Sequence, residues 1–140
     1  MSNSPRLLLD TQVWVHYINA TPGLKPETIR AIDATRESGS VLISVISIWE
    51  IAFLVRLRWL TLNTSVNQWT EQALTLPGTS LLPFTPQIAI GSVDLPEPMH
   101  KDPADRILVA TARIERLTLV TRDRDILTYA KATKLACIQA

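Results

Sequence analysis

Residues 102–125, DPADRILVATARIERLTLVTRDRD, carry the clearest structural signals in the sequence. The first part of this stretch predicts a helix to about Arg116, because Asp102 is a favourable N-cap residue and Pro103 suits the first helical turn. Its second part predicts a strand over 117–121, which ends just before Asp123. A helix followed at once by an apolar strand is typical of proteins built on a parallel sheet.

The same alternation extends along the chain in both directions. Further strands are expected at 6–10, 41–43, 81–84 and 136–139, and further helices at 12–18, 26–37, 44–58, 65–76, 86–93 and 125–132. The strand at 81–84 should lie at an edge or stop early, because Pro83 cannot donate to a ladder. We therefore expect one domain over 1–140, a three-layer α/β/α sandwich around a mainly parallel sheet.

Composition excludes several classes of protein. The 140 residues are 46% hydrophobic with a net charge of +1, so a packed core is expected and the charge alone indicates no nucleic-acid partner. The single cysteine, Cys137, excludes an intrachain disulfide and a cysteine-based zinc site. The longest apolar run, 45–55, contains Glu50 and is too short for a membrane helix. We expect a cytoplasmic protein.

Acidic residues coincide with the expected ends of strands. Asp10 follows the first strand and Asp123 follows the strand at 117–121, while Glu50 and Asp105 lie in neighbouring helices. Carboxyl ends of parallel strands share one edge of a sheet, which is where α/β proteins bind ligands. Clustered carboxylates need a cation, and hard oxygen ligands suit Mg²⁺ or Mn²⁺. Such a site predicts phosphodiester hydrolysis by metal-activated water.

Glu50 is the most informative of these acids. It shares a helical face with Ile46, Trp49 and Phe53, so we expect it in or beside a buried apolar stripe, with Trp49 in the core. A buried charge must be paired, neutralised or bound to a metal. The alternative is an ion pair with an arginine such as Arg56 or Arg58.

Other polar residues have weaker indications. Asp102 fits a helix cap better than a ligand, and Asp125 is a cap or orients its neighbours. Thr11 and Thr121 are placed to orient carboxylates through their hydroxyls. Basic residues beside the acids could hold the phosphodiester backbone of a substrate, although a solvated or ion-paired role is simpler for each: Lys101, Arg106, Arg122 and Arg124.

Residues with aromatic or imidazole rings suggest no chemistry of their own. His16 and His100 are too few and too far apart in sequence for a zinc site, so each is expected in the core or on the surface. Trp59 and Trp69 lie in a stretch with few charges and are candidates for a partner surface.

Four segments in order resemble the PIN domains of VapC-type toxins. They are residues 8–11 (LLDT), 47–51 (SIWEI), 102–112 (DPADRILVATA) and 119–125 (LVTRDRD). The resemblance implies a metal-dependent ribonuclease, the toxin of a toxin–antitoxin pair, that forms a homodimer and binds a cognate antitoxin. It implies that the family's four acidic positions are Asp10, Glu50, Asp105 and Asp123. Among these four positions, Asp102 remains an alternative for the third acid and Asp125 an alternative for the fourth.

The positions of the acidic residues also argue against other functions for an α/β protein of this kind. A haloacid-dehalogenase phosphatase needs an aspartate two residues after the first, where this chain has Gln12. A response-regulator receiver needs an acidic pair and a late lysine in an arrangement that this chain lacks. A catalytically inactive PIN-like module for RNA binding or protein interaction is the remaining alternative, but it gives no reason for a carboxylate at Glu50.

Overall fold

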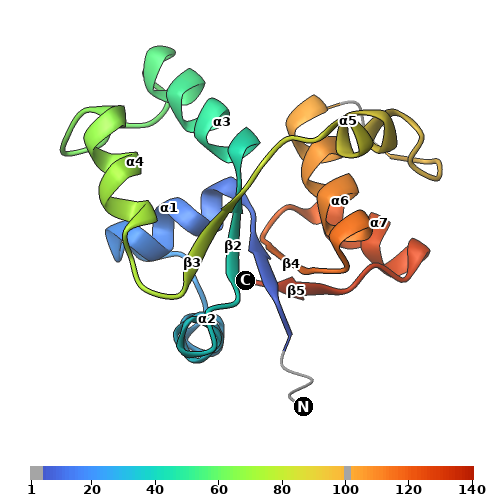
Figure 1. Cartoon of the computed structure of the whole chain (residues 1–140), viewed down its shortest axis with the longest axis horizontal. Coiled ribbons are helices and arrows are strands. Elements are labelled where there is room, and N and C mark those ends of the chain that lie inside the picture. Colours follow the sequence, from blue (N-terminus) through green and yellow to red (C-terminus); the bar gives the residue numbers. More distant parts are fainter. Residues whose placement is uncertain (1–4, 100–101) are drawn as a thin grey trace.

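Five parallel strands form the centre of the protein in a computed structural model, which describes residues 5–99 and 102–140. The strands are β1 (Leu7–Leu9), β2 (Val41–Ser44), β3 (Thr79–Leu82), β4 (Thr118–Thr121) and β5 (Cys137–Gln139). Their order is β3-β2-β1-β4-β5, and every neighbouring pair is parallel. The most buried strand, β1, therefore lies in the middle of the sheet (Figure 1).

Helices cover both faces of this sheet (Figure 1). On one side lie α1 (Thr11–Asn19), α2 (Pro26–Glu37), α3 (Val45–Arg56) and α4 (Val66–Leu74), and on the other lie α5 (Pro86–Val93), α6 (Pro103–Glu115) and α7 (Arg124–Thr133). The expected three-layer α/β/α sandwich is confirmed. No helix in the described ranges is long and apolar enough to cross a membrane.

The alternation of side chains along β1 explains the two layers of core. Leu7 and Leu9 belong to the cluster beneath α1, α2 and α4, whereas Leu8 belongs to the cluster beneath α5, α6 and α7. Successive side chains of a strand point to opposite faces, so an unbroken apolar run marks a strand that is covered on both. The three leucines are each at most 1% exposed.

The strand expected at 81–84 forms two residues earlier, at Thr79–Leu82, so that Pro83 lies just beyond its end. It is an edge strand, as Pro83 requires, because β2 is its only neighbour in the described sheet. The other elements lie within a few residues of the expected bounds.

Two expectations about tryptophans were wrong. Trp49 is 56% exposed, because α3 buries the side that carries Ser47 and Ile51. Trp69 is only 6% exposed and packs edge-to-face on Trp14, with ring centroids 4.9 Å apart. The apolar stripe of α3 that includes Trp49 is thus a surface feature.

Candidate metal-binding cleft

The acids gather where the strand order reverses. From β1 the chain adds β2 and β3 on one side of the sheet, then returns to add β4 and β5 on the other. Ligands of α/β sheets bind beyond the carboxyl ends of the strands at this reversal. A cleft of about 460 Å³ lies there, and the residues that line it are Asp10, Gln12, Glu50, Asp102, Asp105, Arg122 and Asp123.

Asp10 is fixed by two hydrogen bonds. Its Oδ1 accepts from the Thr11 amide at 2.7 Å, which caps α1, and its Oδ2 accepts from the Thr121 hydroxyl at 2.6 Å. Thr121 Oγ1 in turn accepts from the Asp123 amide at 3.0 Å. A single buried hydroxyl therefore joins the acid that follows β1 to the acid that follows β4.

Thr11 joins the site to α3. Its hydroxyl donates to Ser47 Oγ at 2.9 Å, and Ser47 lies one helical turn before Glu50. The Oε1 atom of Glu50 is buried and has no hydrogen-bond partner among the described residues. A buried carboxylate oxygen without a donor is costly, so this atom needs a proton or a cation.

Burial is the main influence on two of the carboxyl groups. It raises the pKa of Asp10, an effect partly offset by the Thr121 hydroxyl and the Thr11 amide and reinforced by the negative charges of Asp123 and Asp102. Burial also raises the pKa of Glu50, and the negative charges of Asp10 and Asp102 add to the rise. Asp10, Glu50, Asp102 and Asp123 lie close enough in the cleft for the charge of one to disfavour the ionised form of another.

The remaining acids begin helices. Asp102 caps α6, since its Oδ1 accepts from the amides of Ala104 at 3.0 Å and Asp105 at 3.3 Å. Asp105 is buried in the first turn of the same helix, and both acids line the cleft. Asp123 caps α7 by accepting from the Ile126 amide at 3.0 Å and also lines the cleft. Asp125 is exposed and does not line it.

The donor set suits a cation that retains water. Within the described ranges, no three histidine, cysteine, aspartate or glutamate side chains stand close enough to enclose one ion. Mg²⁺ commonly binds through one or two carboxylates and keeps several waters, so it does not require such a cage. The unpaired Glu50 oxygen and the five carboxylates that line the cleft therefore fit Mg²⁺ or Mn²⁺.

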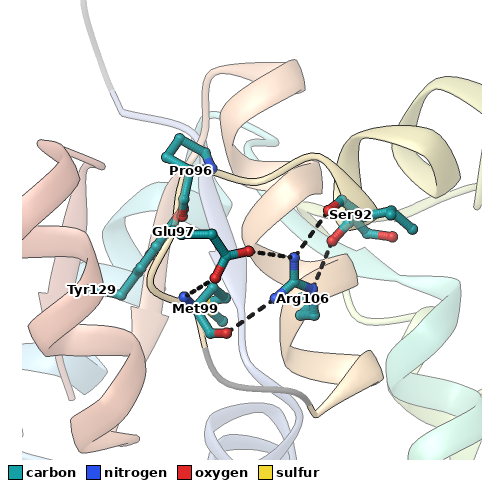
Figure 2. A network of polar contacts seen from close by, with 7 residues as sticks. Ser92, Pro96, Glu97, Met99, Arg106 and Tyr129 are labelled. Carbon is teal, nitrogen blue, oxygen red and sulfur yellow. Dashed lines mark hydrogen bonds and ion pairs between the residues drawn. The ribbon is translucent and has the colours of Figure 1, made fainter.

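The basic residues divide into different roles. Arg122 lines the cleft, and Arg124 is exposed at the start of α7. Lys101 lies outside the described residues. Arg106 is turned away to a backbone network, in which Nε donates to the Ser92 carbonyl at 2.8 Å and Nη1 to the Met99 carbonyl at 3.1 Å (Figure 2).

The Arg106 network holds the segment that leads to the site. Arg106 Nη2 also donates to the Val93 carbonyl at 3.2 Å and forms an ion pair with Glu97 at 3.8 Å. Tyr129 donates to the Pro96 carbonyl at 2.7 Å, which fastens the same segment to α7 (Figure 2). These contacts occupy Arg106, so we do not include it among the residues proposed below to bind RNA.

Two residues that contact the site, Ser47 and His16, had no predicted role in it. Ser47 accepts the Thr11 hydrogen bond, and its position three residues before Glu50 was the available signal. His16 lies within hydrogen-bond distance of Arg122, a contact that no sequence spacing indicates because the two residues are 106 positions apart. Another cavity, of about 790 Å³, contains none of the cleft's acids and is lined mainly by α1, α2 and α4 residues that include Tyr17 and Arg36.

Comparisons with known proteins found one family model and one relative that each match most of the chain. The PIN domain family model matches residues 7–132. Ribonuclease VapC22 of Mycobacterium tuberculosis is 31% identical over 118 residues, which span 84% of this chain and 87% of that protein.

Two solved structures share the fold. VapBC2 from Rickettsia felis, bound to a DNA fragment from their promoter, has a TM-score of 0.70 at 17% identity, with 94% of this chain and 96% of that chain covered. FitAcB from Neisseria gonorrhoeae has a TM-score of 0.65 at 24% identity, with the same coverage of both chains.

Proposed function

Because the chain belongs to the PIN domain family, we propose that it is a Mg²⁺- or Mn²⁺-dependent endoribonuclease, the toxin component of a toxin–antitoxin pair. The observation that carries this proposal is the presence of Asp10, Glu50, Asp105 and Asp123 around one cleft at the reversal of strand order. The identity to ribonuclease VapC22 supports RNA as the substrate.

One or two of the four acids would bind the divalent ion directly, and the others would act on it through its retained waters. When bound, such an ion lowers the pKa of a coordinated water and stabilises charge on phosphoryl oxygens, which is the chemistry that phosphodiester hydrolysis needs. The Thr11 amide and the Thr121 hydroxyl fix the orientation of the Asp10 carboxylate. Asp10 and Asp123 also cap α1 and α7, which fixes the backbone on either side of the cleft. A cation would also stabilise the ionised form of the buried Glu50 carboxylate.

Arg122 and Arg124 are the basic residues that we propose for contact with the RNA backbone. Arg122 lines the cleft itself, and Arg124 is exposed one helical position after Asp123. Lys101 stays a candidate on sequence grounds. Arginine suits this role because its planar guanidinium can pair with two phosphate oxygens at once.

Hydrolysis of RNA by the purified protein tests the function directly. Cleavage is expected with Mg²⁺ or Mn²⁺, and its loss is expected with EDTA and in both Asp10→Ala and Asp105→Ala. Full activity in either variant would overturn the assignment of that residue. RNA binding without cleavage at any metal concentration would instead favour the inactive, RNA-binding PIN-like module.

We propose a homodimer through the exposed stripe of α3. Val45, Trp49, Phe53 and Leu57 are 36%, 56%, 47% and 39% exposed, and they recur every four residues along α3 and its C-cap. The rings of Trp49 and Phe53 stack with centroids 5.3 Å apart. Rows at this spacing form the ridges by which helices pack against like ridges, so a second copy of α3 is the simplest cover.

The second proposed partner is a cognate antitoxin. This proposal follows from the resemblance to VapC-type toxins and the identity to ribonuclease VapC22. Expression of the chain together with the product of any small adjacent reading frame, followed by purification on a tag carried by this chain alone, tests it. Co-elution with loss of ribonuclease activity is the expected result, and separate elution with full activity would contradict it.

A further inference from the structure

Arg122 is a cation placed among acids. The cleft residues besides it are five carboxylates and Gln12. In the described part of the chain, no ion pair within 4.0 Å joins Arg122 to any of those carboxylates. An arginine that lines an acidic cleft without bonding to the acids is available to an anionic ligand.

His16 holds the guanidinium of Arg122. Nη1 of Arg122 lies 3.3 Å from His16 Nε2, and Nδ1 of His16 lies 2.7 Å from Thr21 Oγ1. A guanidinium can only donate, so Nε2 must be the acceptor and must carry no proton. The neutral imidazole then has its proton on Nδ1, which donates to Thr21. In this tautomer both contacts are hydrogen bonds, and the chain of donors runs from Arg122 to His16 to Thr21.

The loop after α1 is shaped to admit this contact. α1 ends at Ala20 in the left-handed conformation, and Gly23 follows with φ +141°. A Cβ on Gly23 would lie 3.0 Å from Arg122 Nη1 and 3.1 Å from His16 Cε1, so a side chain there would crowd both partners. Glycine at position 23 thus permits a backbone path that presses the loop against the Arg122–His16 pair.

From these contacts we propose that Arg122 binds the RNA phosphate at the cleft and that His16 is the positioning residue that presents its guanidinium. The inference rests on the proposed ribonuclease function and names a substrate-binding residue and its support. A held guanidinium offers two parallel donors to one phosphate, whereas a free arginine side chain must lose rotamer entropy first.

A binding experiment tests the pair without requiring cleavage. Anisotropy of a labelled single-stranded oligoribonucleotide is measured in EDTA at pH 8 over a range of salt concentrations, for wild type, Arg122→Gln, His16→Ala and the double variant. Arg122→Gln should weaken binding about tenfold and lower the slope of log K against log salt by about 0.7. His16→Ala should weaken binding about threefold, and the double variant should match Arg122→Gln, because one residue acts through the other.

Two further variants separate positioning from loss of packing. His16→Gln keeps an oxygen acceptor within reach of Arg122 and should recover most of the affinity lost in His16→Ala. Arg124→Gln, a matched loss of a neighbouring charge with no contact to His16, should be additive with His16→Ala. Additive losses in His16→Ala/Arg122→Gln, or wild-type affinity and salt slope in Arg122→Gln, would overturn the inference.

The tautomer supplies a readout that is independent of RNA. Nitrogen-15 NMR of the imidazole at pH 8 should show His16 protonated on Nδ1 in wild type, and Arg122→Gln should shift the Nε2 resonance. Protonation on Nε2 would overturn the inference. If the protein binds RNA as described but does not cleave it, the proposed ribonuclease function is refuted and the inference about Arg122 and His16 stands. If the protein cleaves RNA but Arg122→Gln binds it with wild-type affinity and salt dependence, the inference is refuted and the proposed function stands.

Discussion

Replacement of Thr121 by valine isolates the hydroxyl that joins the two strand-end acids. Thr121 is fully buried, and its Oγ1 donates to Asp10 Oδ2 at 2.6 Å while accepting from the Asp123 amide at 3.0 Å. Valine has nearly the same shape, so the change removes hydrogen bonds without opening a cavity. Asp10 is 6% exposed, and water cannot easily replace the lost donor.

The expected loss of stability is about 2–4 kcal/mol in metal-free protein. A hydrogen bond to a charged group contributes about 1.5–3 kcal/mol, and the Asp123 amide loses its acceptor as well, although partial exposure lets water compensate there. The hydroxyl lowers the pKa of Asp10 because it stabilises the ionised form. The loss should therefore be largest when Asp10 is ionised and should shrink as the pH falls toward the ordinary value of 3.8.

Urea denaturation at pH 8 and at pH 4, both in EDTA, measures this difference. Thr118→Val serves as the control, since Thr118 lies on the same strand at the end away from the cleft. Thr121→Ser should recover most of the stability. A loss below about 0.5 kcal/mol at pH 8, or an equal loss in Thr118→Val, would refute the reasoning.

Three other outcomes follow from the site and the surface. Because burial raises the folded-state pKa of Asp10 and Glu50, their protonation favours folding; this contribution is present below about pH 4 and disappears as the pH rises through the raised values. Thermal melts in EDTA should thus show a smaller loss of stability between pH 5 and pH 8 for Glu50→Gln than for wild type, and an equal loss would contradict the assignment. Asp123→Asn should lower ribonuclease activity by more than about 100-fold, whereas the exposed Asp125→Asn should stay within about twofold, and a reversed order would exchange their roles. Trp49→Ala should weaken a dimer by at least about 30-fold in sedimentation experiments, and an unchanged mass would exclude the α3 stripe as its interface.

Much of the fold could be predicted because local signals agree with one another. Asp102-Pro103 marks the start of α6, Ser44 marks the start of α3, and the all-apolar Leu7–Leu9 marks the central strand. The predicted bounds of the strands needed only a small correction at Pro83, which limits β3 to residues before it. Each of these signals lies in or directly beside the helix or strand that it predicts.

The orientation of α3 could not be predicted in the same way. Its residues are apolar on nearly every side, so periodicity does not identify the face that packs inward. The sheet buries Ser47 and Ile51 and leaves Trp49 and Phe53 exposed, an arrangement that depends on tertiary packing. An exposed apolar stripe is typical of a surface that binds a partner. A single sequence does not distinguish such a stripe from one that packs in the core.

The candidate site also contains some features that the sequence predicts and others that it does not. The acids after β1 and β4 follow from the rule that parallel strands end at one edge, and Asp105 follows from the start of α6. The contact between His16 and Arg122 joins residues from opposite ends of the chain and depends on the loop at Gly23. No sequence pattern specifies such a contact, since it requires both the strand order and the path of that loop.

The proposed function requires that the acids beyond β1 and β4 hold a divalent cation. Crystals of the protein soaked in Mn²⁺, with anomalous diffraction recorded at the manganese absorption edge, would locate such a cation. A strong anomalous peak within coordinating distance of Asp10 and at least one of Glu50, Asp105 and Asp123 is the predicted result. A cleft without such a peak at millimolar Mn²⁺, or manganese bound only elsewhere on the protein, would contradict the account.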